Sequence, residues 1–369
     1  MRSVRTGLIG CGKVGGIHAR ALARLAESEL VAVCDAQGER ARGFAARYGG
    51  RAFDDPCAML AQAGVEAVSI CTPHPLHRDP AVLAARAGVH VLVEKPLAAS
   101  LADCDAMMAA ARESGVTLGA VSQRRFYEPV MRLKAAIDAG KIGAPVLGTV
   151  LMLSWRDEAY YRSDPWRGRL DAEGGGVLVN QAPHHLDLLR WFMGPVARVT
   201  GACANLNHPY IEVEDTALAI LHFRSGALGS ILTSLSQKPG IYTKLHVHGA
   251  NGASVGVETD TGATFVAGMT GVVDPPLNDL WTVPGEEPLL AAFQAEDRAH
   301  FGAVDATEHY HALQIQDFLC AVRDGREPAV TAEDGRAVVE LFTAIYRSSQ
   351  SGAPVELPLG AKVADQEGK

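Results

Sequence analysis

The sequence lacks the features that mark secreted, membrane-spanning and nucleic-acid-binding proteins. Its seven cysteines are scattered and form no Cys-x-x-Cys pair, which argues against a disulfide framework and a zinc knuckle. No apolar run approaches the roughly 20 residues that a membrane helix needs, and the amino terminus shows no signal-peptide pattern. Lys and Arg number 34 against 42 Asp and Glu, so a polyanion is not an expected partner. We therefore expect a cytoplasmic protein that binds neither nucleic acid nor membrane.

The first part of the chain, residues 1–124, has the pattern of a dinucleotide-binding domain. A length of 369 residues suggests two domains, and in this part short apolar runs alternate with helical patterns. Such alternation predicts strand-helix-strand units, and hence a doubly wound parallel Rossmann sheet with helices on both faces. The expected strands are residues 6–10, 30–34, 67–72, 90–93 and 116–121.

The second part, residues 125–369, predicts an α+β domain that binds the substrate and mediates oligomerisation. Apolar and polar residues alternate over its runs, and turn residues at 224–226 and 250–252 suit tight hairpins. We expect a large, open, mainly antiparallel sheet with a helix at 181–192 laid against it, and room for the final helices to pack back on the first domain. The expected strands are residues 146–155, 198–204, 216–223, 227–234, 244–248 and 254–258.

A glycine-rich loop follows the first expected strand and opens a helix. In Gly10-Cys11-Gly12-Lys13-Val14-Gly15, the first glycine permits the tight turn, the second allows close approach of a pyrophosphate, and the third allows strand-helix packing. The cofactor-binding residues predicted here are Gly10, Gly12, Lys13, Val14 and Gly15.

Asp35 ends the second expected strand, where a ribose diol would lie. A carboxylate accepts hydrogen bonds from both ribose hydroxyls and repels a ribose phosphate, so NAD is favoured over NADP. The alternative is an ordinary helix-capping aspartate before Gln37-Gly38, and nearby Arg40 weakens the preference.

Glu94-Lys95-Pro96 follows the fourth expected strand, at the sheet edge where doubly wound folds bind ligands. A lysine there, partly desolvated and near a cationic nicotinamide, would have a lowered pKa and could exchange a proton with a substrate hydroxyl. A surface turn is the alternative interpretation.

Together these segments resemble the Gfo/Idh/MocA family of NAD(P)-dependent oxidoreductases over nearly the whole chain. The further matching motifs are Thr72-Pro-x-x-x-His77, Arg125-Phe126, Trp166-Arg167, Gly174-Gly175-Gly176, His184-His185-Leu186-Asp187 and Pro328-x-Val330-Thr331-x-Glu333-Asp334-Gly335.

The resemblance implies roles for individual residues. Lys95 would be the catalytic lysine, His184 the catalytic histidine, and Asn180 would occupy a catalytic position where many members have an aspartate. Further cofactor contacts would come from Thr72, His74, His77, Glu94, Lys95, Gln123, Trp166 and Arg167. The substrate would be bound by Lys95, Arg125, Tyr161, Asn180 and His184, although the loop containing Tyr161 could equally belong to a subunit interface.

Asn180 departs from the family pattern, because an amide cannot take a proton. We interpret it as a subgroup feature, with proton handling left to Lys95 and His184. Asp187 lies three residues after His184 on the same helix face and is expected to fix the tautomer of its imidazole. His222, His246 and His248 could meet on one sheet face, but no spaced carboxylate or cysteine completes a metal site, so no metal is expected.

The sequence thus predicts an NAD-dependent dehydrogenase that oxidises a secondary hydroxyl of a sugar, an inositol or a sugar derivative. A homodimer or homotetramer is expected. Two alternatives remain open: a redox-cycling NAD-dependent lyase or glycosidase, and a non-catalytic nucleotide-binding sensor.

Overall fold

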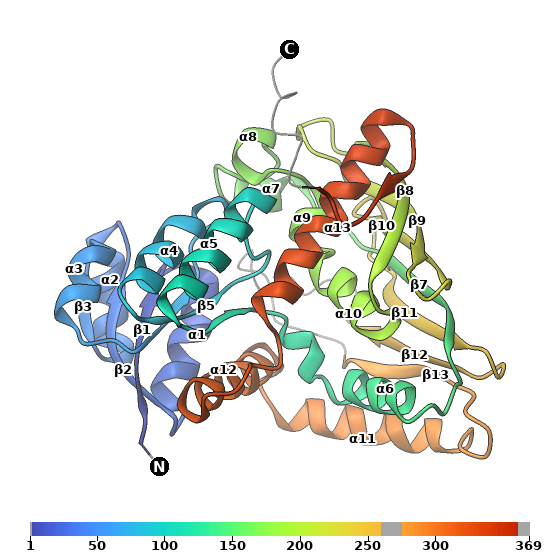
Figure 1. The fold of residues 1–369 in the computed structure, drawn as a ribbon, viewed down its shortest axis with the longest axis horizontal. Helices are drawn as coiled ribbons and strands as arrows, with labels where there is room; N and C mark the ends of the chain where they lie inside the picture. Colours follow the sequence, from blue (N-terminus) through green and yellow to red (C-terminus); the bar gives the residue numbers. More distant parts are fainter. Residues whose placement is uncertain (1, 260–274, 361–369) are drawn as a thin grey trace.

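The computed structural model describes residues 2–259 and 275–360, and within them the chain forms two sheets flanked by helices (Figure 1). Residue 1 and residues 361–369, the ends of the expected domain ranges, lie outside the described residues. The first sheet has the order β3-β2-β1-β4-β5-β6, and all its strands are parallel. The predicted Rossmann sheet is confirmed. Its strands are β1 (Val4–Ile9), β2 (Ser28–Cys34), β3 (Arg51–Phe53), β4 (Ala67–Ile70), β5 (His90–Val93) and β6 (Leu118–Ala120).

Five α-helices and a short 3₁₀ turn connect these strands. Ser100 caps the last of the five, because its side chain accepts a hydrogen bond from the Asp103 N–H, and Gly115 ends that helix in the left-handed conformation. The connecting elements are α1 (Lys13–Arg24), α2 (Gly38–Tyr48), α3 (Pro56–Gln62), η1 (His74–Leu76), α4 (Arg78–Arg86) and α5 (Leu101–Ser114).

Within the described residues the second sheet has eight strands, in the order β13-β12-β11-β7-β10-β9-β8-β14. Neighbours are antiparallel except β10 and β7, which are parallel, so the predicted open, mainly antiparallel sheet is confirmed. Both expected hairpins form, and each turn contains a glycine with positive φ, Gly226 and Gly252. The strands are β7 (Pro145–Leu153), β8 (Val196–Ala204), β9 (Thr216–Phe223), β10 (Leu228–Ser234), β11 (Tyr242–Gly249), β12 (Ser254–Thr259), β13 (Leu277–Trp281) and β14 (Val355–Glu356).

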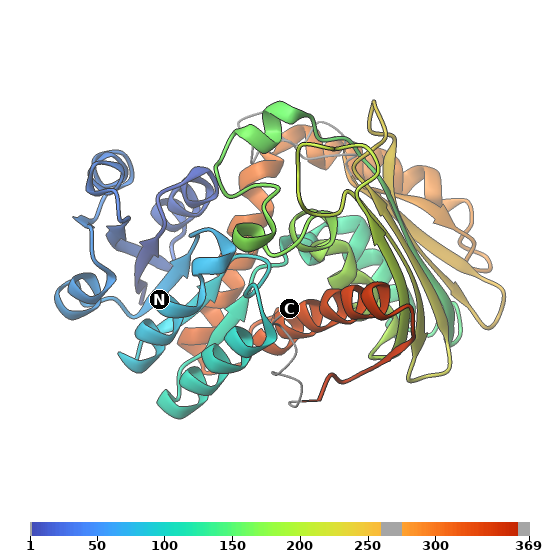
Figure 2. The same cartoon turned by 90° about the horizontal axis from the view of Figure 1, so that it is seen from above.

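Helices of the second half cover one face of this sheet and also reach the first domain (Figure 2). α10 packs against β7, α13 packs against β8, and α12 packs against α1 of the Rossmann domain. Sequence periodicity did not predict α11. The elements are η2 (Gln123–Phe126), α6 (Glu128–Asp138), α7 (Glu158–Arg162), α8 (Leu170–Glu173), α9 (Val177–Asn180), α10 (Pro183–Met193), α11 (Leu289–Ala303), α12 (Ala306–Asp324) and α13 (Ala332–Ser351).

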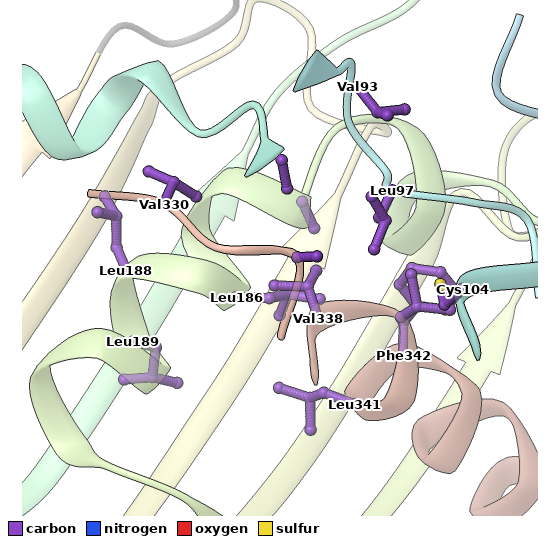
Figure 3. Close-up of a cluster of buried hydrophobic side chains, with 14 of the residues drawn as sticks. Val93, Leu97, Cys104, Leu186, Leu188, Leu189, Val330, Val338, Leu341 and Phe342 are labelled. Carbon is purple, nitrogen blue, oxygen red and sulfur yellow. The ribbon is translucent and has the colours of Figure 1, made fainter. Parts of the chain in front are cut away.

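A buried apolar cluster joins the two domains beneath the carboxyl end of β5 (Figure 3). Leu97, two residues after Lys95, and Leu186, two residues after His184, both belong to it, together with Val338 and Phe342 of α13. Burial of these side chains stabilises the packing by about 25 cal/mol for each Å² of apolar surface removed from water. The core therefore fixes the segments that contain Lys95 and His184.

The outer face of the second sheet exposes apolar side chains. Leu218, Ile220 and Leu228 alternate with buried residues on β9 and β10 and are 48%, 57% and 46% exposed. None of the helices in the described ranges combines the length and the apolar composition that crossing a membrane requires.

Candidate active site

The glycine loop between β1 and α1 leaves room for a phosphate group. Gly10 has φ +100°, and a Cβ there would lie 2.6 Å from the Cys71 backbone carbonyl carbon. A Cβ on Gly15 would lie 2.0 Å from the Gly10 oxygen, so both positions require glycine. A Cβ on Gly12 would meet no described atom within 4 Å. Gly12 is also the N-cap of α1, so open space adjoins the helix N–H groups that bind phosphates, and the loop fits a dinucleotide.

Asp35 is held at the end of β2 by two backbone N–H groups. Its Oδ2 accepts a hydrogen bond from Cys11 N at 2.8 Å, and its Oδ1 accepts one from Gln37 N at 2.9 Å. The carboxylate thus supports both the glycine loop and the turn before α2. Each oxygen has a second lone pair, so ribose hydroxyls could still bind.

Lys95 lies just beyond the carboxyl end of β5 and reaches the second domain. Its Nζ donates a hydrogen bond to the Asn180 backbone oxygen at 2.8 Å. Desolvation is the largest cause that lowers the pKa of Lys95, from 10.5 to about 8, while Glu94 opposes the shift. An amine with this pKa can exchange a proton near neutral pH.

Glu94 and His18 form a buried pair behind Lys95. Burial alone would raise the pKa of Glu94, but the His18 Nε2 hydrogen bond at 2.9 Å and nearby positive charges lower it to about 2. Glu94 Oε2 also accepts a hydrogen bond from the Lys95 N–H at 3.0 Å. These contacts make Glu94 a support for Lys95, a role that the sequence motif alone did not reveal.

His184 begins α10 and lines the same cavity as Lys95 and Ser122. Burial is the largest cause that lowers its pKa well below the usual value, and the positive charges of Arg124 and Lys95 add to it. Its Nδ1 has no hydrogen-bond partner among the described residues. His184 is therefore a neutral imidazole with polar capacity left for a ligand.

The prediction that Asp187 contacts His184 is wrong. Asp187 instead accepts hydrogen bonds from Ser122 Oγ at 2.6 Å and from Arg125, whose Nη2 lies 2.5 Å from Oδ1. Arg125 also pairs with Asp334 at 3.0 Å and lies over the Trp191 ring. A charged guanidinium outcompetes a neutral imidazole for the carboxylate. These partners hold the Arg125 side chain in place, and its contact with the substrate remains a prediction.

Around Asn180 the structure forms a network that the sequence did not predict. Its side-chain amide donates hydrogen bonds to Glu173 Oε1 and, at 3.3 Å, to the Tyr160 hydroxyl. The same hydroxyl accepts hydrogen bonds from Arg167 at 2.6 Å and Gln181 at 2.8 Å. Glu173 is 1% exposed, and burial raises its pKa to about 7. Only the positions of Asn180 and Arg167 had been singled out by the motifs.

Trp166, Arg167 and His74 pack together at the edge of this network. The Arg167 guanidinium lies 4.5 Å from the centroids of both the Trp166 and Tyr160 rings. His74 packs edge-on against Trp166, and its Nε2 donates a hydrogen bond to the Glu173 backbone oxygen at 2.5 Å. The segment after β4 is thereby tied to the second domain.

The other predicted cofactor residues are Thr72, His77 and Gln123, and they differ in whether their polar atoms already have hydrogen-bond partners. His77 is buried with one ring nitrogen 2.9 Å from the Thr72 oxygen and the other 3.1 Å from the Pro96 oxygen. Thr72 Oγ1 donates a hydrogen bond to the Leu76 oxygen. Gln123 keeps a buried Oε1 with no partner among the described residues, so it has an acceptor available for a ligand.

Tyr161 lies in a small apolar cluster with Tyr160, Ile211 and Val213. Its ring also contacts His208 and Tyr210, and its buried hydroxyl has no hydrogen-bond partner among the described residues. The structure therefore places it against protein side chains, and its role at the substrate remains a prediction.

The three sheet histidines do not converge on one point. His246 pairs with Asp279 at 2.8 Å, His248 with Ser254 at 2.8 Å, and His222 with Arg198 at 3.1 Å. Each therefore has a partner of its own on the sheet.

Comparisons with known proteins agree with the fold. Residues 4–121 match the family model described as "Oxidoreductase family, NAD-binding Rossmann fold", and residues 134–357 match "Oxidoreductase family, C-terminal alpha/beta domain". The chain is 28% identical over 362 residues to myo-inositol 2-dehydrogenase of Thermotoga maritima, covering 96% of this chain and 98% of the relative. It is 29% identical over 366 residues to scyllo-inositol 2-dehydrogenase (NAD(+)) of Bacillus subtilis, covering 96% of each.

Among solved structures, the WlbA dehydrogenase of Bordetella pertussis in complex with NADH and UDP-GlcNAcA matches with TM-score 0.82 and 32% identity, covering 97% of this chain and 100% of the other. The fold, the glycine loop and these matches define an NAD(P)-dependent oxidoreductase. More narrowly, the chain belongs to the Gfo/Idh/MocA oxidoreductase family.

Proposed function

We propose that the protein is an NAD-dependent dehydrogenase that oxidises a secondary hydroxyl group of a sugar, an inositol or a sugar derivative. The observation that carries the proposal is the Lys95 amine, whose pKa is lowered to about 8 where the Rossmann domain meets the second domain. Such an amine suits general-base removal of a hydroxyl proton.

The cofactor would be held by the glycine loop, Asp35 and the segments that surround Lys95. The open space at Gly12 suits the pyrophosphate, and Asp35 favours the unphosphorylated ribose of NAD. When bound, the nicotinamide supplies a hydride acceptor. Gln123 Oε1 and the Trp166-Arg167 pair are candidates for contacts at the nicotinamide end.

Lys95 and His184 would divide the handling of the substrate hydroxyl. Neutral Lys95 accepts the proton at Nζ, while His184, kept neutral by burial and by nearby positive charges, orients the oxygen through a hydrogen bond. General-base catalysis of this kind contributes roughly 10²- to 10⁴-fold.

The substrate class rests on the relatives named above, which are called inositol dehydrogenases or are bound to a UDP-linked sugar acid. The hydrogen-bonding groups near Lys95, namely His184 and Asn180, are suited to a polyhydroxylated ligand. A homodimer or homotetramer is part of the proposal, since the exposed leucines and isoleucine on β9 and β10 form an apolar sheet face.

The test is a spectrophotometric screen of the purified protein with NAD and with NADP. The panel contains inositols, monosaccharides, anhydrosugars, glycosides and a UDP-linked sugar acid. Accumulation of NADH with one group supports the proposal and gives the substrate class. Substrate conversion without net NADH would favour a redox-cycling lyase or glycosidase, and NAD binding without conversion would favour a sensor.

A further inference from the structure

Glu173 is a buried carboxyl group next to the proposed base, and the mechanism above does not use it. It ends α8, and its side chain is almost completely removed from solvent. Its Oε1 accepts a hydrogen bond from Asn180 Nδ2, and its Oε2 accepts one from Gly168 N at 2.5 Å. Since both oxygens face N–H donors, this arrangement suits the ionised carboxylate.

Asn180 connects Glu173 with Lys95. The side-chain amide of Asn180 donates to Glu173, and the backbone oxygen of the same residue accepts the Lys95 Nζ hydrogen bond at 2.8 Å. An amide carries no charge and takes up no proton near neutral pH. The negative charge on this side of Lys95 therefore comes from Glu173. Asn180 fixes the positions of Glu173 and Lys95 relative to each other.

We propose that Glu173 is a positioning residue that supplies, through Asn180, the negative charge that stabilises the Lys95 ammonium formed during the reaction. This inference rests on the proposed dehydrogenase function. The substrate O–H bond breaks and its proton passes to Lys95 Nζ. The hydride leaves the carbon that bears this oxygen for the bound NAD, and the C–O bond becomes a carbonyl. Glu173 gains and loses no atom.

The charges that surround Lys95 determine the direction of the effect. Desolvation, Arg167 and Arg124 lower the pKa of Lys95, whereas Glu94 and Glu173 raise it. Removal of the Glu173 charge therefore makes Lys95 a weaker base, which loses its proton at lower pH. A residue that only packs would leave this titration unchanged.

Glu173 is itself ionised in the pH range that matters. Burial raises its pKa to about 7, and Glu214 adds to this, while the bonds from Gly168 and Asn180 and the charge of Arg167 oppose it. His74, which contacts the Glu173 backbone oxygen, has a pKa lowered to about 3 by burial and is neutral. At pH 8, where Lys95 titrates, Glu173 carries its charge.

The test measures the titration of Lys95 in the full-length protein without substrate. Trace acetylation with acetic anhydride across a pH series, read by mass spectrometry of the Lys95 peptide, gives an inflection that we expect near 8 in the wild type. Glu173→Gln should move this inflection down by about one pH unit. The acid limb of the pH profile of NAD-linked turnover should move by the same amount.

A charge swap separates charge from packing. In the double variant Glu173→Gln with Asn180→Asp, one amide and one carboxylate again face each other with donor and acceptor exchanged, so the inflection should return to near 8. If Glu173→Gln does not fold, Asn180→Ala is the second variant, because loss of its amide donor raises the pKa of Glu173 and should lower the Lys95 inflection below 8.

Glu214→Gln is the matched control, because Glu214 is also a buried glutamate and is not among the charges that most affect the pKa of Lys95. Its Lys95 inflection should equal the wild-type value. An unchanged inflection in Glu173→Gln, or no recovery in the double variant, would overturn the inference. If no alcohol is oxidised in the substrate screen, the proposed function fails, whereas the labelling still decides the role of Glu173.

Discussion

The Lys95 side chain donates a hydrogen bond to the backbone oxygen of Asn180, with 2.8 Å between the two atoms. Lys95 follows the fifth strand of the Rossmann sheet, and Asn180 ends a short helix of the second domain. The proposed base is therefore held by both domains. Its position depends on their packing, which the apolar cluster around Leu97 and Leu186 provides.

The titration of Lys95 predicts the pH dependence of oxidation. Neutral Lys95 is required to accept the substrate proton, so kcat/KM should rise with pH, pass an inflection near 8 and level off above it. The measurement is a pH series of initial NADH formation at low substrate concentration. An inflection near 10.5, the usual value for a lysine, would contradict a desolvated base.

Two glycines of the cofactor loop should respond differently to alanine. Gly15→Ala places a Cβ 2.0 Å from the Gly10 oxygen, so it should destabilise the fold even though glycine-to-alanine changes inside helices usually stabilise. Gly12→Ala meets no described atom within 4 Å and should fold normally, but it should weaken NAD binding about tenfold or more, because the methyl group enters the phosphate space. Thermal unfolding and calorimetric NAD titration measure the two effects. Equal stability of the two variants would argue against this geometry.

Asp35 should determine the choice between NAD and NADP. Asp35→Asn keeps the side-chain shape but removes the charge that repels a ribose phosphate, so the ratio of kcat/KM for NAD to that for NADP should fall about tenfold. Steady-state kinetics with both cofactors measures this ratio. An unchanged ratio would mean that Asp35 does not select between the cofactors and serves only through its contacts with Cys11 and Gln37.

The Arg125 contacts should be a major source of stability. Arg125→Met leaves the Asp187 carboxylate buried without its guanidinium partner, which costs about 3–5 kcal/mol of unfolding free energy. Lys141→Ala breaks an ion pair at the surface and should cost less than about 1 kcal/mol. Denaturant unfolding of both variants provides the comparison, and a small loss in Arg125→Met would be inconsistent with a structural clamp.

Local patterns predicted the fold and singled out Lys95, but they did not predict the contacts between side chains from distant segments. The glycine loop was recognisable because its spacing alone sets the turn and the helix start. The contact from His184 to Asp187 was mispredicted because helix spacing shows which residues are neighbours and not which partner binds more strongly. Arg125, 62 residues away in sequence, binds that carboxylate instead.

Glu173 escaped the sequence analysis for a related reason. It lies in a four-residue helix, where no periodicity indicates which way a side chain points. Its contacts with Asn180 and Gly168 depend on how the segment between β7 and α10 folds over the site.

The role of Lys95 is tested most directly by the Lys95→Ala variant with the best substrate from the screen, through the rate of NADH formation in a single turnover. NAD binding, followed by calorimetry, should remain within a few-fold of the wild type. If Lys95 is the base, the rate should fall by roughly 10²- to 10⁴-fold. A variant that forms NADH at a near wild-type rate while chemistry is limiting would contradict the assignment of Lys95 as the base.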